Sequence, residues 1–219
     1  MIDGVSVHAA RTRAGALLAQ TCPAPADVVI GVPDSGLDGA VGYAQAAGLP
    51  YAIGFVKNRY VGRTFLSPGQ RVRERLVDVK LSVIASAVRG KRVVLLDDSV
   101  VRGTTAAGIV GKLRAAGAAE VHLRLTAPPF LAPCYYGTDI PDDRQLIAAH
   151  HTLEEVRDIL SCDSLGYLPR ACLGRLLGPG HQAGYCEACF GGVYAAGTPQ
   201  ITGKDRFERK RSEGKGEDD

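Results

Sequence analysis

Short apolar runs of strand length recur along the chain, and stretches that fit helices separate them. Strands are expected at 28–32, 51–56, 92–96 and 121–126. Helices are expected at 7–19, 37–47, 73–88, 104–116 and 152–160. Short runs that are apolar at nearly every position are typical of parallel strands buried on both faces. The alternation therefore predicts an α/β fold with an open, mostly parallel sheet flanked by helices.

Composition and length favour one domain. The chain has 219 residues, of which 46% are hydrophobic, enough to bury a substantial core. We expect residues 1–198 to form this domain, with a cysteine-containing segment at its end. The tail 199–219 is different: from Gly203 onward it carries six basic and six acidic residues among seventeen. Such a segment cannot bury much apolar surface, so we expect it to be disordered.

The overall charge and the lack of a targeting signal bear on the expected partners and location of the protein. A net charge of +3 gives no reason to expect a nucleic-acid partner. No window approaches the roughly 20 apolar residues of a membrane span, and the N-terminus lacks a basic segment leading into an apolar one. We therefore expect a cytoplasmic protein with no membrane partner. Its six cysteines are then expected to be reduced thiols or metal ligands rather than disulfides.

Two loops are expected to carry the chemistry, because ligands of open α/β sheets bind outside the carboxyl ends of the strands. The first loop is 33–36 and the second is 97–105. In the second, Asp97 and Asp98 can accept hydrogen bonds from ribose hydroxyls or bind Mg²⁺, a cation that prefers oxygen ligands. Backbone N–H groups at 102–105, at a helix start, can hold a phosphate. The plainer interpretation is a turn that caps the following helix.

The run Val93–Thr105 lacks the glycine patterns of nucleotide triphosphatases and of dinucleotide sites. It resembles the phosphoribosyl-pyrophosphate motif of type I phosphoribosyltransferases. Three further segments, 31–35, 57–65 and 133–137, narrow the likeness to the transferase half of glutamine phosphoribosylpyrophosphate amidotransferases. The likeness runs from about Asp3 to about Tyr194. It implies the type I phosphoribosyltransferase fold with a flexible closing loop.

The resemblance also implies roles for individual residues. Those at the pyrophosphate loop are Pro33, Asp34 and Ser35. Those that hold the phosphoribosyl group are Ser99, Val100, Val101, Arg102, Gly103, Thr104 and Thr105. The positions associated with Mg²⁺ are Ser35, Asp97 and Asp98. Catalysis would fall to Asp97 and Asp98 together with the start of the closing loop, namely Lys57, Arg59, Tyr60 and Arg63.

The charge pattern of the segment 57–80 agrees with such a loop. It has seven basic residues against two acidic ones, a local excess of five. These cations would neutralise charge on a departing pyrophosphate, and closure would exclude water from a reactive sugar cation. From charge alone, the alternative is a solvated helix face or basic loop. No general base stands out among the five histidines, and a neutral amine nucleophile needs little help from one.

The family resemblance implies transfer of the phosphoribosyl group from phosphoribosyl pyrophosphate to ammonia, giving 5-phosphoribosylamine in purine synthesis. The likeness starts at the transferase half, so glutamine hydrolysis is not expected from this polypeptide. The nitrogen would come from free ammonia, a separate glutaminase chain or another amine, unless the chain is a truncated product. The family also implies a homo-oligomer. Two alternatives stay open: a regulator that binds phosphoribosyl pyrophosphate, and a transferase acting on another amine or a base.

Three cysteines match further family positions. Cys186 and Cys189 have a ligand-type spacing, and with Cys134 they resemble three of the four thiolates that hold a [4Fe-4S] cluster in one branch of the family. A single Cys-x-x-Cys is also compatible with zinc, a redox role or reduced structural thiols.

Overall fold

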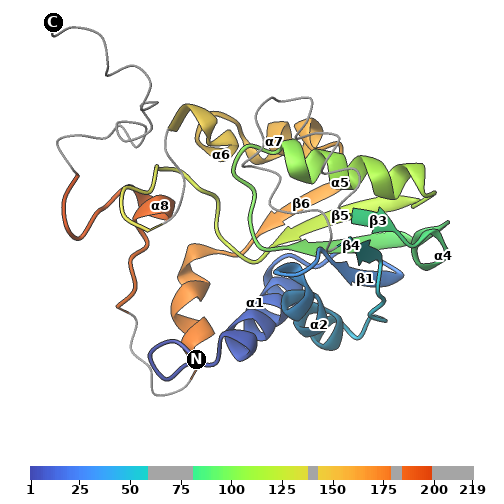
Figure 1. The fold of residues 1–219 in the computed structure, drawn as a ribbon, viewed down its shortest axis with the longest axis horizontal. Coiled ribbons are helices and arrows are strands. Elements are labelled where there is room, and N and C mark those ends of the chain that lie inside the picture. Colours follow the sequence, from blue (N-terminus) through green and yellow to red (C-terminus); the bar gives the residue numbers. More distant parts are fainter. Residues whose placement is uncertain (59–80, 138–142, 179–183, 199–219) are drawn as a thin grey trace, which may run out of the picture.

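The computed structural model describes residues 1–58, 81–137, 143–178 and 184–198. Its centre is a parallel sheet of four strands in the order β1 (Val28–Gly31), β4 (Arg92–Asp97), β5 (Glu120–Leu125) and β6 (Ser164–Tyr167) (Figure 1). The register pairs Gly31 with Leu96, and Asp97 with Leu125. The carboxyl ends of these strands therefore meet along one edge, and the expected α/β fold with a parallel sheet is confirmed.

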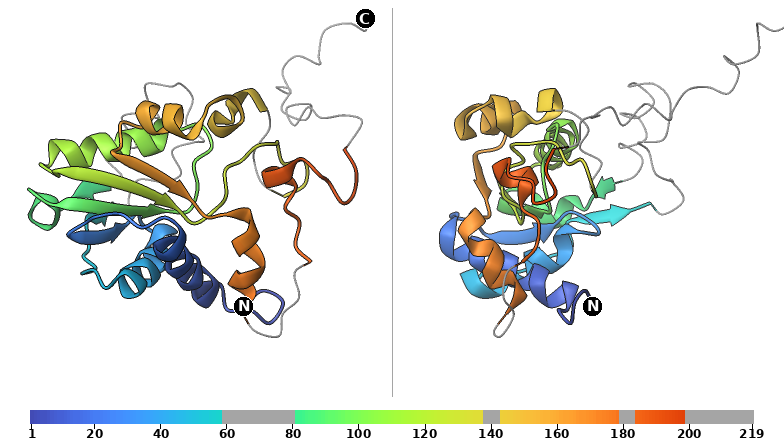
Figure 2. Two further views of the ribbon diagram at one scale, coloured as in Figure 1. Left: turned by 180° about the vertical axis from the view of Figure 1, so that it is seen from behind. Right: turned by 90° about the vertical axis from the view of Figure 1, so that its left-hand side faces the viewer.

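Helices cover both faces of the sheet (Figure 2). Helices α1 (Val7–Thr21) and α2 (Gly36–Ala47) lie on one face, where Val94 and Leu96 join their core. On the other face, α5 (Thr104–Ala115) packs with Val93 and Leu95. Successive side chains of a strand point to opposite faces, so β4 is buried on both sides. Burying one such Leu or Val contributes about 1.5–3 kcal/mol.

Local capping explains several helix ends. Helix α1 begins after Ser6, whose hydroxyl accepts a hydrogen bond from the Ala9 amide at 3.3 Å. Helix α7 (Leu153–Ile159) begins with a capping box, in which Thr152 and Glu155 each accept a hydrogen bond from the other's backbone amide. Helix α2 ends at Gly48, which is left-handed at φ 65°. The sequence predicts all of these helices, as well as α5, to within two residues at each end.

The expected strand at 51–56 is wrong for most of its length. Only Tyr51 bridges β1, and residues Phe55–Lys57 (β2) instead pair antiparallel with Leu81–Val83 (β3) in a separate ribbon. The apolar side chains Ile53 and Val56 are exposed, at 65% and 58%. An apolar run alone cannot distinguish a strand inside a parallel sheet from one that leaves it.

The expected helix at 73–88 is also corrected. Its first part, 73–80, lies outside the described residues. The remainder begins with β3 and forms a helix only at α4 (Ala85–Val88). The valine and leucine of the Leu81–Val83 segment pair with β2, so tertiary pairing prevails over local helix propensity here.

Several short elements follow β5 and complete the described chain. They are η2 (Asp143–Gln145), α6 (Ile147–His150), η3 (Arg170–Leu177) and α8 (Ala188–Gly191). No helix within the described ranges is long and apolar enough to cross a membrane. The tail 199–219 lies outside those ranges, so its expected disorder stays a prediction.

Candidate active site

The loops that follow β1 and β4 lie against each other at the carboxyl edge of the sheet. The amide of Val32 donates to Leu96 O at 2.8 Å, which extends the strand pairing into the first loop. At Gly36, an added Cβ would lie 2.4 Å from Leu96 O and 3.2 Å from the Asp97 Cα. Only glycine permits so close an approach of two backbones. The expected pyrophosphate loop (residues 33–36) is therefore held beside the acidic pair, Asp97 and Asp98.

The acidic pair consists of Asp97, the last residue of β4, and Asp98, which follows it. Asp97 is half-buried and its Oδ1 accepts a hydrogen bond from the Asp98 amide at 2.8 Å, whereas Asp98 is exposed and accepts one from Ser99 Oγ at 3.3 Å. Desolvation, and then the charge of Asp98, raise the pKa of Asp97 to about 7. A carboxylate with such a shift, beside a second carboxylate, gains from a cation or from hydrogen-bond donors. The backbone of the two aspartates is fixed, because the amides of Thr126 and Ala127 donate hydrogen bonds to the carbonyls of Asp97 and Asp98 at 3.0 and 2.9 Å.

Lys57 reaches the pyrophosphate loop from the end of β2. Its ammonium forms an ion pair with the Asp34 carboxylate. The two residues are 23 positions apart in the sequence, and the β2–β3 ribbon brings them together. The lysine side chain is 26% exposed and the aspartate 67%, so a pyrophosphate group could replace the carboxylate as the partner of the ammonium without burying an unpaired charge.

The expected phosphate loop (residues 99–105) runs from the acidic pair into α5. Gly103 has φ 83°, and α5 begins at the next residue, with no side-chain cap hydrogen bond among the residues that the structure describes. The first amides of α5 and the exposed Thr104 and Thr105 are available to an anion, which the helix dipole also favours. An added Cβ at Gly103 would lie 2.9 Å from Ile147 Cδ1, so α6 supports the loop from behind.

Other residues expected at the site are placed as follows. The side chain of Val100 is buried at 4% exposure and joins the core, so only its backbone can contact a ligand. Val101 packs beside Phe130 and Leu146. Arg59, Tyr60 and Arg63 lie outside the described residues. The expected closing loop falls mostly in the same undescribed range, and its role stays a prediction.

Sequence reasoning did not single out the segment from η2 to α6. It lines a cavity next to Arg102 with Arg144, Gln145, His150 and His151. The neighbouring pair His150–His151 was visible in the sequence, but nothing there indicated that it would face the phosphate loop.

The three cysteines of the expected cluster are neighbours in space. Cys134 and Cys189 pack against Phe130 and Leu146. Burial raises the pKa of the Cys189 thiol, and the charges of Cys134 and Cys186 add to the rise. Within the described ranges, however, no group of three or more His, Cys, Asp or Glu side chains is arranged to hold a metal ion. A bound [4Fe-4S] cluster stays a prediction, and we assign no chemistry to it.

Comparison with known proteins identifies relatives of this chain. No protein-family model matches the chain. An amidophosphoribosyltransferase of Archaeoglobus fulgidus is 50% identical over 200 residues, which cover 91% of this chain and 44% of the relative. The amidophosphoribosyltransferase of Bacillus subtilis is 50% identical over 198 residues, covering 88% and 41%.

Solved structures agree with these relatives. Glutamine phosphoribosylpyrophosphate amidotransferase from B. subtilis, in complex with ADP and GMP, matches with a TM-score of 0.80 at 48% identity, over 89% of this chain and 44% of that one. A structure described as the allosteric regulatory enzyme of purine biosynthesis gives 0.82 at 47% identity, over 92% and 44%. The chain spans less than half the length of the relatives it matches. It belongs to the amidophosphoribosyltransferase family and corresponds to the phosphoribosyltransferase half of those longer proteins.

Proposed function

We propose that this chain transfers the 5-phosphoribosyl group of phosphoribosyl pyrophosphate to ammonia and releases pyrophosphate. The observation that carries the proposal is the juxtaposition of the acidic pair with the pyrophosphate loop, since Gly36 brings the two loop backbones into contact. Relatives of about 50% identity named amidophosphoribosyltransferases support the same activity. The product would be 5-phosphoribosylamine, the first intermediate of purine synthesis.

Each part of the site has a role in this reaction. The amides at the start of α5 and the hydroxyls of Thr104 and Thr105 would bind the 5-phosphate. Asp97 and Asp98 would accept hydrogen bonds from the two ribose hydroxyls, which fixes the sugar ring. The pyrophosphate would lie along the loop 33–36, where Lys57 can exchange its partner Asp34 for a phosphate oxygen.

The chemical step breaks the bond between C1 of the ribose and the pyrophosphate oxygen and forms a bond from C1 to nitrogen. The departing pyrophosphate takes the electron pair of the broken bond, and the Lys57 ammonium stabilises the charge that develops there. The attacking ammonia loses one proton after the new bond has formed. That proton passes to water, since a neutral amine nucleophile needs no protein base to attack.

Magnesium is the cofactor we propose for the site. Mg²⁺ at phosphate sites is usually held by one or two carboxylates together with substrate oxygens, so it needs no preformed group of three protein ligands. Asp97 and Asp98 fit this requirement, and Ser35 lies on the neighbouring loop. When bound, the ion would stabilise negative charge on the leaving pyrophosphate.

Pyrophosphate release from phosphoribosyl pyrophosphate in the presence of Mg²⁺ tests the function. We expect release with ammonium at alkaline pH, where free ammonia is abundant, and none with glutamine as the only nitrogen source. A panel of purine and pyrimidine bases serves as the control for acceptor identity. Faster release with one of these bases than with ammonium would contradict the proposal, and so would donor binding without turnover with any acceptor.

A further inference from the structure

A small hydrophobic cluster lies apart from the two main cores of the protein. Its buried residues are Phe130 and Leu146, at 9% and 0% exposure. Val101 of the expected phosphate loop packs against them, and so does Phe190 of α8. Phe130 follows β5 and Leu146 precedes α6. The small cluster therefore joins four segments that are distant from one another in the sequence.

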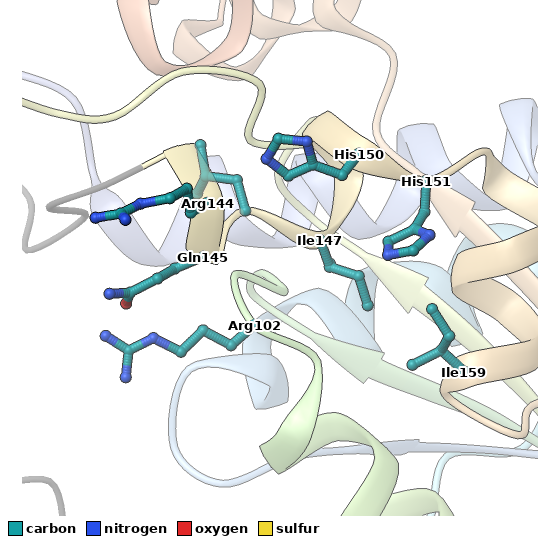
Figure 3. A pocket seen from close by; sticks show the side chains of 8 residues that line it. Arg102, Arg144, Gln145, Ile147, His150, His151 and Ile159 are labelled. Atoms are coloured by element: carbon teal, nitrogen blue, oxygen red, sulfur yellow. The ribbon is translucent and has the colours of Figure 1, made fainter.

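The expected phosphate loop depends on few contacts around Val101. The Ile147 amide donates a hydrogen bond to Val101 O at 2.9 Å, and the Val101 side chain packs in the small cluster. The next residue, Arg102, lines an open cavity together with Ile147 (Figure 3). Because the loop borders open space beside Arg102, its position depends on the packing of Val101.

Helix α8 is attached to the chain that follows β5. The amides of Leu131 and Ala132 both donate to the Cys189 carbonyl, at 2.8 and 3.1 Å. The ring centroids of Phe130 and Phe190 are 5.2 Å apart, a separation at which aromatic rings attract each other. Figures 1 and 2 show α8 beside this part of the chain. The Phe190 ring is thus held against Phe130.

A charged pair attaches the other side of α8 to η3. Arg170 Nε donates to Glu187 Oε2 at 2.7 Å. The Arg170 side chain lies across Gly191, where an added Cβ would be 2.2 Å from Arg170 Nη1. A helix of only four residues has little stability by itself. Contacts with the rest of the protein therefore determine where α8 lies.

We propose that Phe190 is a positioning residue for the expected phosphate loop, and that it acts through Phe130 and Leu146 on Val101. The inference rests on the proposed function, which assigns this loop to the 5-phosphate. A loop that is already in its binding arrangement binds more tightly, because a ligand need not order it. The segment 184–198 then belongs to the donor site, although Val101 and Phe190 are 89 positions apart in the sequence.

Amide hydrogen exchange tests the support of the loop without any ligand. The reporter is the Ile147 amide, which donates to the loop backbone, and the reference is the Asp163 amide, which donates to Val121 O at 2.9 Å. Phe190→Ala should speed exchange at Ile147 by about tenfold and leave Asp163 unchanged. Phe190→Leu keeps a large apolar side chain and should restore slow exchange. Val193→Ala is the matched control, because that side chain is 76% exposed in the same segment.

Ribose 5-phosphate serves as the binding probe, and calorimetry measures its affinity. Phe190→Ala should weaken binding about tenfold, as expected for coupling through packed side chains, whereas Phe190→Leu and Val193→Ala should bind as the wild type does. The inference is overturned, with the proposed function left standing, if Phe190→Ala binds normally, if its Ile147 exchange is unchanged, or if Ile147 and Asp163 accelerate equally. Absence of binding to the wild type would overturn the proposed donor site together with this inference.

Discussion

A single residue, Gly103, determines the path of the phosphate loop. Its φ of 83° lies in the left-handed region, and the position of its missing Cβ is occupied by Ile147 Cδ1 at 2.9 Å and Leu160 Cδ2 at 3.2 Å. Glycine is therefore required here for two reasons, the backbone angle and the space. The sequence predicts that this glycine belongs to a phosphate-binding loop, and that role stays a prediction. The packing of Ile147 and Leu160 against it could not be predicted, because both residues are more than forty positions away.

Gly103→Ala should lower the free energy of unfolding by about 2–4 kcal/mol, because it adds a steric clash to the left-handed strain. Gly90→Ala is the matched control: Gly90 has φ 70°, but a Cβ there would meet nothing within 4 Å. That variant should lose about 1 kcal/mol, from backbone strain alone. Urea denaturation of both variants measures the difference. Equal losses would show that α6 does not support the loop as described.

At the level of elements, β1 and β4 are joined at their start by a charged pair. Arg92 donates to the Asp27 carboxylate from its backbone amide at 2.8 Å, and its Nη2 and Nε lie 2.8 and 3.2 Å from that carboxylate. Hydrogen bonds from the Arg92 side chain and then its backbone lower the pKa of Asp27 from 3.8 to about 2. The pair holds the register that brings both strands to the same carboxyl edge.

The depressed pKa predicts a pH dependence of stability. Above pH 3.8 Asp27 is ionised in both states and the pair contributes fully; as the pH falls through about 2 the folded state is also protonated and the contribution is lost. The difference in unfolding free energy between wild type and Asp27→Asn should therefore shrink as the pH falls from about 5 to about 2. Denaturation curves across this range measure it, and Arg92→Gln should reproduce the effect. A constant difference would contradict the ion pair.

The elements differ in how well the sequence predicted them. β1, β4 and β5 were predicted because their apolar runs are buried on both faces. β6 was not, since Ser164 and Gly166 interrupt its apolar pattern. Because Gly166 has no side chain, the Arg124 side chain can approach it closely. The buried guanidinium of Arg124 donates hydrogen bonds to the carbonyls of Cys22 and Pro23 at 2.7 and 3.1 Å. Such a long-range network leaves no periodic signal in the sequence.

For the whole molecule, the order of the strands determines where chemistry can occur. The sheet brings the ends of β1 and β4 together, although the paired residues Gly31 and Leu96 are 65 positions apart in the sequence. The sequence predicted both loops and the fold, because each loop directly follows a recognisable strand. It could not predict the cavity beside Arg102, which exists only because η2 and α6 pack against the phosphate loop.

We propose that the acidic pair at the end of β4 is the catalytic site of a phosphoribosyltransferase. Pyrophosphate release from phosphoribosyl pyrophosphate with Mg²⁺ and ammonium, compared between wild type and the double variant Asp97→Asn with Asp98→Asn, tests it most directly. Asp158→Asn, at the exposed end of α7, is the matched control. We predict a loss of turnover of at least about 10²-fold in the double variant and wild-type turnover in the control. Turnover retained in a folded double variant would contradict the claim.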